Sequence, residues 1–132
     1  MSYLIDTNII IYSLKNNVIV QENFIRNKNI PKSISIITYG ELLYGAKKSM
    51  QVEKNLAVTY RIKELFTIIS VDLPIIETFT DLKSKYGKVG IVIEDFDLLI
   101  AATALTNNQI LVTNNTKHFD KIDGLVLENW SK

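Results

Sequence analysis

The sequence contains no cysteine and only one histidine, His118. The absence of cysteine excludes disulfide bonds and thiolate metal sites. The single histidine excludes histidine-rich zinc sites, and it makes any Ser-His-Asp mechanism depend on His118 alone. These two absences remove much of the usual zinc and thiol chemistry before any motif is considered.

The chain also lacks an excess of either charge, because 15 basic and 14 acidic side chains give a formal net charge of +1. A protein that binds nucleic acid by charge alone is expected to be far more basic. Contact with nucleic acid would therefore need a local basic patch, or metal ions that supply positive charge. The length of 132 residues fits one domain, residues 1–132, and 47% hydrophobic with 22% charged residues is typical of a globular protein.

Long apolar runs are missing as well. The N-terminal residues 1–6 have neither the basic region nor the long apolar region of a signal peptide. No apolar run approaches the roughly 18 residues that a membrane span needs. These absences predict a cytoplasmic protein without a membrane partner.

Short apolar runs and helical patterns alternate along the chain. The runs predict strands at residues 3–5, 33–37, 67–71, 109–113 and 125–127. Helices are expected at 9–14 with Asn8 as N-cap, from Thr38 onward, at 51–66, from Pro74 to the glycines at 87 and 90, at 96–105 and at 117–122. This alternation predicts an α/β fold with a central, mainly parallel sheet flanked by helices.

Polar residues lie near the ends of several expected strands. Asp6 follows the first strand, Glu41 lies in the first helical turn after the second, and Asn114 and Asn115 follow the fourth. Asp97 begins an apolar helix that leads into the fourth strand. Functional sites of open parallel sheets gather beyond the carboxyl ends of the strands. We therefore expect these positions to meet at one edge of the sheet.

Each position also has an ordinary structural explanation. Asp6 could cap the helix that follows it, and Glu41 and Asp97 could interact favourably with the positive ends of their helices. Asp95 could act as the N-cap beside Asp97. Asparagines after a strand, such as Asn115, are common turn formers.

Taken together, the carboxylates indicate a metal site. Asp6 and Asp97 adjoin apolar segments, where an uncompensated carboxylate is costly, and neither has a lysine or arginine beside it in the sequence. Bringing Asp6, Glu41 and Asp97 together would also raise some of their pKa values through mutual repulsion. Mg²⁺ or Mn²⁺, which accept oxygen ligands, would relieve both problems.

Four segments resemble, in order and spacing, the motifs of PIN-domain nucleases. They are residues 4–12, 36–45, 97–102, and 111–115 followed by Phe119. The final residues 124–130 resemble the close of VapC-type toxins, a large bacterial branch of that family. Each motif alone is weak, but the set covers nearly the whole chain and is specific.

The resemblance implies a PIN-like three-layer fold and a divalent-metal-dependent endoribonuclease, usually the toxin of a VapBC-type toxin–antitoxin pair. It assigns the metal ligands to Asp6, Glu41 and Asp97. Asn115 stands where the family often has a further acid, and its neutral amide could coordinate the metal weakly or accept a hydrogen bond from a metal-bound water. The expected reaction is hydrolysis of RNA phosphodiesters, with transfer RNA the first substrate class, by a water molecule that the metal activates.

Further residues are candidates for a supporting role. Thr7, Asn8 and Thr113 are expected to orient water or phosphate oxygens, although local capping and turn bonds explain them equally well. Asp95, with Glu94, could partly replace the missing acid, but a helix-capping role is the simpler interpretation. We expect His118 to be a surface or packing residue.

The resemblance also implies two protein partners. Relatives usually form homodimers, and a VapB-like antitoxin silences them by laying its C-terminal segment across the active-site groove. A basic side chain of the antitoxin would then supply positive charge to the acidic cluster.

Three other hypotheses remain. A PIN-like binding module that has lost its metal is favoured by Asn115 but disfavoured by the three retained carboxylates. A haloacid-dehalogenase-type phosphohydrolase needs a second aspartate where this chain has Asn8. A receiver domain needs an acidic pair near the start, and Asp6 stands alone there, although Asp72 follows the third strand.

Overall fold

A computed structural model describes all 132 residues of the chain. At its centre is a five-stranded sheet in the order β3-β2-β1-β4-β5, in which every neighbouring pair is parallel. The strands are β1 (Tyr3–Ile5), β2 (Lys32–Ser35), β3 (Thr67–Ile69), β4 (Ile110–Val112) and β5 (Leu127–Glu128). The predicted α/β class is confirmed, and the sheet is parallel throughout.

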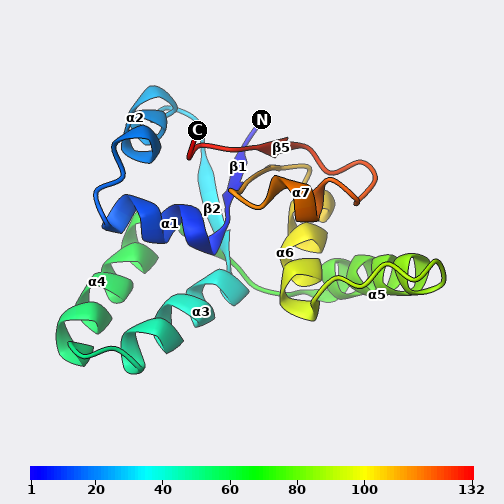
Figure 1. The fold of residues 1–132 in the computed structure, drawn as a ribbon, viewed down its shortest axis with the longest axis horizontal. Coiled ribbons are helices and arrows are strands. Elements are labelled where there is room, and N and C mark those ends of the chain that lie inside the picture. Colours follow the sequence, from blue (N-terminus) through cyan, green and yellow to red (C-terminus); the bar gives the residue numbers. More distant parts are fainter.

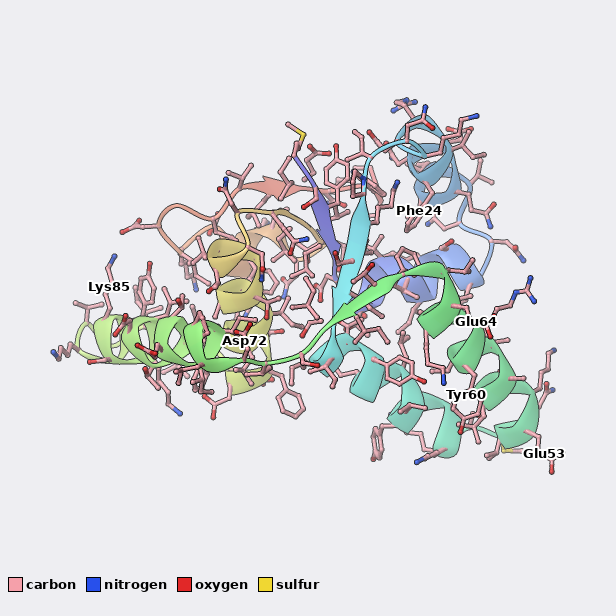
Figure 2. All side chains as sticks on the ribbon, turned by 180° about the vertical axis from the view of Figure 1, so that it is seen from behind. Phe24, Glu53, Tyr60, Glu64, Asp72 and Lys85 are labelled. Carbon is pink, nitrogen blue, oxygen red and sulfur yellow. The ribbon has the colours of Figure 1, made fainter.

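Helices cover both faces of this sheet. They are α1 (Thr7–Leu14), α2 (Val18–Arg26), α3 (Ile36–Lys47), α4 (Val52–Leu65), α5 (Leu73–Gly87), α6 (Asp95–Thr106) and α7 (Thr116–Phe119). Figure 1 shows β1 and β2 in the middle, with α1 to α4 on one side and α5 to α7 on the other. In the view from behind, α4 carries Glu53, Tyr60 and Glu64 on one flank, while α5 extends from Asp72 to Lys85 on the opposite flank (Figure 2).

The side chains of β1 alternate between two hydrophobic cores. Leu4 is buried with side chains of α5, α6 and α7, whereas its neighbours Tyr3 and Ile5 are buried with side chains of α1, α2 and α4. Successive side chains of a strand point to opposite faces, so a central parallel strand must be apolar on both sides. This pattern produces the three layers of the fold.

The strand order reverses beside β1. The chain first adds β2 and β3 on one side of β1, and then returns to add β4 and β5 on the other side. In a parallel sheet, such a reversal leaves a crevice at the carboxyl ends of the two strands that flank it. Asp6 and Thr113 are the first residues after β1 and β4, so both lie at this crevice.

Two expected helix starts were wrong because a different residue caps each helix. Asp6, not Asn8, is the N-cap of α1, since its carboxylate accepts a hydrogen bond from the Thr7 N–H. The Ser35 hydroxyl accepts from the Ile37 N–H, so α3 begins at Ile36 and takes two residues from the expected strand 33–37. The Ser35 cap ends β2 sooner than its apolar run suggests, whereas β1 ends at Ile5 as expected.

Other boundaries also differ from expectation. Helix α2 was not predicted, although Asn17 caps it, and of its residues only Val20 is fully buried. Glu94 rather than Asp95 is the N-cap residue of α6. Phe96, expected on a helix buried all round, is 57% exposed. No helix is both long enough and apolar enough to cross a lipid bilayer.

The end of the chain is held in the core by Trp130. Its side chain is 2% exposed, and its ring packs edge-to-face against Tyr3 and Phe24, with centroids 5.0 and 5.1 Å away. Its indole N–H donates to Glu128, and its backbone carbonyl accepts from the Asn23 side chain at 3.0 Å. Trp130 therefore joins the C-terminus to β1 and α2.

Replacing Trp130 with alanine is expected to destabilise the fold by about 3–5 kcal/mol, because a large buried aromatic side chain leaves a cavity. Urea unfolding followed by far-UV circular dichroism measures this loss without needing tryptophan fluorescence. Val126→Ala is the control: Val126 is 58% exposed, and its loss should change stability by no more than about 0.5 kcal/mol. Equal effects of the two substitutions would contradict the anchoring role.

Candidate active site

Asp6 connects the two central strands at the crevice. One carboxylate oxygen accepts from the Thr7 N–H at 2.8 Å, and the other accepts from the Thr113 hydroxyl at 2.8 Å. Thr113 in turn accepts from the Asn115 N–H at 3.0 Å, which shapes the turn into α7. Asp6 is only 7% exposed, so its orientation is fixed by the fold.

Thr7 connects Asp6 to the second carboxylate. The Thr7 hydroxyl donates to Oε1 of Glu41 on α3 at 2.6 Å, and its oxygen lies 3.1 Å from the hydroxyl oxygen of buried Thr38. Glu41 itself is exposed, and it lies in the second turn of α3 because that helix begins at Ile36. The Thr7 contact therefore holds this exposed side chain toward the crevice.

Asp97 lies in the first turn of α6 and is close to His118 of α7. The His118 Nε2 atom lies 3.1 Å from Oδ2 of Asp97, and the two side chains are 25% and 31% exposed. Nε2 is buried and lies within ion-pair distance of Asp97, but it has no hydrogen-bond partner. Sequence reasoning missed this contact, and nothing in the spacing of the two residues could have revealed it.

The charges of these carboxylates act on one another. Burial is the main cause that raises the pKa of Asp6, and the Asp97 carboxylate raises it further, against the hydrogen bonds from Thr113 and Thr7. Burial also raises the pKa of Asp97 most, with His118 acting in the opposite direction and Glu41 adding to the increase. The predicted carboxylates therefore lie close enough to repel one another.

The remaining predicted residues divide into two groups. Asn8 lies at the rim, where its amide is 3.5 Å from the Asn114 side chain, and Asn114 donates to the Tyr12 hydroxyl at 3.0 Å. Asp95 instead turns outward to an exposed ion pair with Lys83 at 2.9 Å. The side chain of Asn115 is exposed and makes no hydrogen bond to the carboxylates.

The donor set matches a hard divalent cation in its chemistry. Asp6, Glu41 and Asp97 supply carboxylate oxygens, and no lysine or arginine forms an ion pair with any of them. The buried Nε2 of His118 also lacks a hydrogen-bond partner. No three Asp, Glu or His side chains converge closely enough to hold an ion, since each carboxylate is turned toward a protein contact of its own.

A groove of about 600 Å³ runs beside Thr7 and Glu41. Its walls come from α1, α3 and the start of α6, and they include Tyr44, Lys48 and Phe96. The Lys48 ammonium lies 5.1 Å from the centre of the Tyr44 ring. The groove thus combines exposed aromatic surface and positive charge next to the carboxylates.

Asp6→Asn is expected to raise thermal stability at neutral pH in metal-free buffer. The raised pKa means that ionised Asp6 costs folding free energy, whereas asparagine keeps the acceptor for Thr7 without the charge. Below the ordinary aspartate pKa of 3.8 the wild-type carboxyl is protonated in both states, so the gain should vanish there and grow as pH rises.

Thermal unfolding from pH 3.5 to 8 measures this difference. Asp81→Asn, at an exposed position of α5, is the control and should show no such pH-dependent gain. A variant at Asp6 that is less stable than wild type at every pH would contradict the proposed cost of the buried charge.

Comparison with known proteins agrees with this arrangement. The sequence matches the PIN domain family over residues 3–125. It is 34% identical to the tRNA(fMet)-specific endonuclease VapC of Shigella flexneri, with 99% of both chains covered. It is 36% identical to Ribonuclease VapC2 of Haemophilus influenzae strain Rd, with 98% of both chains covered.

Solved structures show the same fold. VapBC2 from Rickettsia felis, bound to a DNA fragment from its promoter, matches with a TM-score of 0.92 and 35% identity over 98% of this chain and 99% of that chain. DNA-bound VapBC from Salmonella typhimurium matches with a TM-score of 0.91 and 30% identity over 98% of both chains. The chain therefore belongs to the PIN-domain family, in its VapC ribonuclease branch.

Proposed function

We propose that this VapC-type ribonuclease hydrolyses RNA phosphodiesters with a divalent cation, Mg²⁺ or Mn²⁺, held by Asp6, Glu41 and Asp97. One observation carries the proposal. Three carboxylates from different elements lie around the crevice, each turned toward a protein contact, and the pKa values of Asp6 and Asp97 are raised by burial and by neighbouring carboxylate charge. Such an arrangement costs stability unless a cation offsets it.

The residues around the crevice have distinct tasks in this proposal. When bound, the cation would activate a water molecule and offset negative charge on the phosphate. Thr113 and the Thr7 N–H orient the two oxygens of Asp6, while the Thr7 hydroxyl positions Glu41. Asn8, exposed at the rim, offers an amide donor to a phosphate oxygen.

Transfer RNA is the substrate class we propose. Two relatives, from Shigella flexneri and Salmonella typhimurium, are tRNA(fMet)-specific endonucleases, at 34% and 31% identity. In the groove, Tyr44 and Phe96 offer rings for stacking on unpaired bases, and Lys48 offers charge for a phosphate. A substrate that is RNA also supports the cytoplasmic location expected from the sequence.

Asp97→Asn is expected to lower the rate of tRNA cleavage by more than about 100-fold, because a lost metal ligand should exceed the roughly 10–100-fold cost of an outer-shell change. Chelation of divalent ions should abolish cleavage by the wild-type protein. Purified chain, bacterial tRNA and gel analysis of the fragments with Mg²⁺ or Mn²⁺ provide the measurement.

Asp95→Asn is the matched control. It removes the same charge two residues away on α6, from a side chain that pairs with Lys83 at the surface. This variant should retain near wild-type cleavage. Cleavage that survives Asp97→Asn would sink the proposed site, and a folded wild-type protein that cuts no RNA with either metal would favour the alternative of an inactive PIN-like binding module.

We further propose that an antitoxin of the VapB type occupies the groove. The matched structures from Rickettsia felis and Salmonella typhimurium are VapBC complexes, and the groove lies directly beside Glu41. A basic side chain of the partner would offset the charge of the carboxylates when no metal does. The homodimer that the family resemblance implies stays a prediction, which light scattering can check.

Tyr44→Ala is expected to weaken binding of a VapB-type antitoxin by roughly 10–30-fold, as for an interface aromatic anchor. Tyr60→Ala is a closely matched control. Both tyrosines are exposed and both have a lysine near the ring, at 5.1 Å for Tyr44 and 5.5 Å for Tyr60, but only Tyr44 lines the groove. If calorimetric titration showed that the two substitutions weaken antitoxin binding equally, the antitoxin would bind outside the groove.

A further inference from the structure

His118 is a side chain at the crevice that the proposed function leaves without a role. Its Nε2 atom is buried, makes no hydrogen bond, and lies 3.1 Å from Oδ2 of Asp97. A buried ring nitrogen without a partner is costly, and such atoms usually indicate a missing ligand or a functional role. It is also the only histidine of the chain.

The fold fixes the position of this ring. The backbone N–H of His118 donates to the Asn115 carbonyl at 3.1 Å, and the neighbouring Phe119 is 1% exposed in the core. The rings of His118 and Phe119 also meet edge-to-face, with centroids 5.5 Å apart. Nε2 is therefore held at the crevice by groups that belong to the core of the molecule.

The separation of the two atoms fits a shared ion. Ligand atoms about 2.1 Å from an octahedral cation lie roughly 3 Å apart when they occupy adjacent positions. Nε2 and Oδ2 lie 3.1 Å apart, and Nε2 has no hydrogen-bond partner. Two lone pairs at this distance repel each other unless a proton or a cation lies between them.

We propose that His118 is a nitrogen ligand, through Nε2, of the cation that Asp97 holds, and that the centre therefore prefers Mn²⁺ to Mg²⁺. Carboxylate and water oxygens suit both ions, whereas Mn²⁺, as a first-row transition-metal ion, also binds at sites with nitrogen ligands. The inference rests on the proposed metal centre and adds to it a ligand type and an order of preference among ions.

A different role for His118 predicts an effect of opposite sign. If the ring served only as an internal cation for Asp97, it would compete with every added ion. Its removal would then strengthen the binding of Mg²⁺ and Mn²⁺ alike. As a ligand, its removal weakens Mn²⁺ binding and leaves Mg²⁺ binding nearly unchanged.

Calorimetric titration of the full chain with Mn²⁺ alone and with Mg²⁺ alone distinguishes these roles. We expect His118→Gln to weaken Mn²⁺ binding by about 10–100-fold or more, and Mg²⁺ binding by less than about 3-fold. Lys117→Gln, the adjacent exposed position on α7, should bind both ions as the wild type does. Circular dichroism checks that each variant is folded.

A spectroscopic measurement on the wild type needs no variant. Pulsed electron paramagnetic resonance of bound Mn²⁺ should show coupling to a directly coordinated nitrogen, which the single histidine assigns to His118. Equal losses for both ions, tighter binding of both, or no nitrogen coupling would overturn the inference while leaving the metal centre in place. A folded wild-type chain that binds neither ion would overturn the metal centre and this inference together.

Discussion

The hydrogen bond from the Thr113 hydroxyl to Asp6 joins the ends of β1 and β4 where the order of the strands reverses. Asp6 also caps α1 through the Thr7 N–H, so one carboxylate orients a strand end, a helix start and the turn that follows Thr113. Because the crevice arises from the strand order, any residue directly after β1 or β4 would face it. Because these residues are Asp6 and Thr113, which form hydrogen bonds, and not apolar residues, the crevice is a candidate active site.

This arrangement concentrates negative charge where the two cores meet. Asp6 is buried between apolar strands and Asp97 heads a helix packed in one core, and burial raises the pKa of both carboxyl groups. Buried carboxylates need a stable support, and the two hydrophobic cores provide it by packing against both faces of the sheet. The free energy gained by packing the two cores therefore offsets the cost of the charges at the crevice.

Sequence patterns predicted the class of the fold and the placement of Asp6, Glu41 and Asp97 near one sheet edge, because parallel strands place successive carboxyl ends together. They failed where a local cap interrupts an apolar run, as at Ser35, which begins α3 within the expected strand. Helix α2 was missed since few of its side chains are buried. His118 was taken for a surface or packing residue because its contact with Asp97 depends on the placement of α7 against α6, which no local pattern encodes.

Thr7 and Glu41 belong to the carboxylate cluster and also line the groove, and a hydrogen bond of 2.6 Å between them ties α1 to α3. An ion that binds the Glu41 carboxylate must compete with this hydrogen bond. A ligand that enters the groove contacts the same two side chains. The two binding events are therefore thermodynamically linked. Linkage is reciprocal: the factor by which an ion changes the affinity for a groove ligand is the factor by which that ligand changes the affinity for the ion.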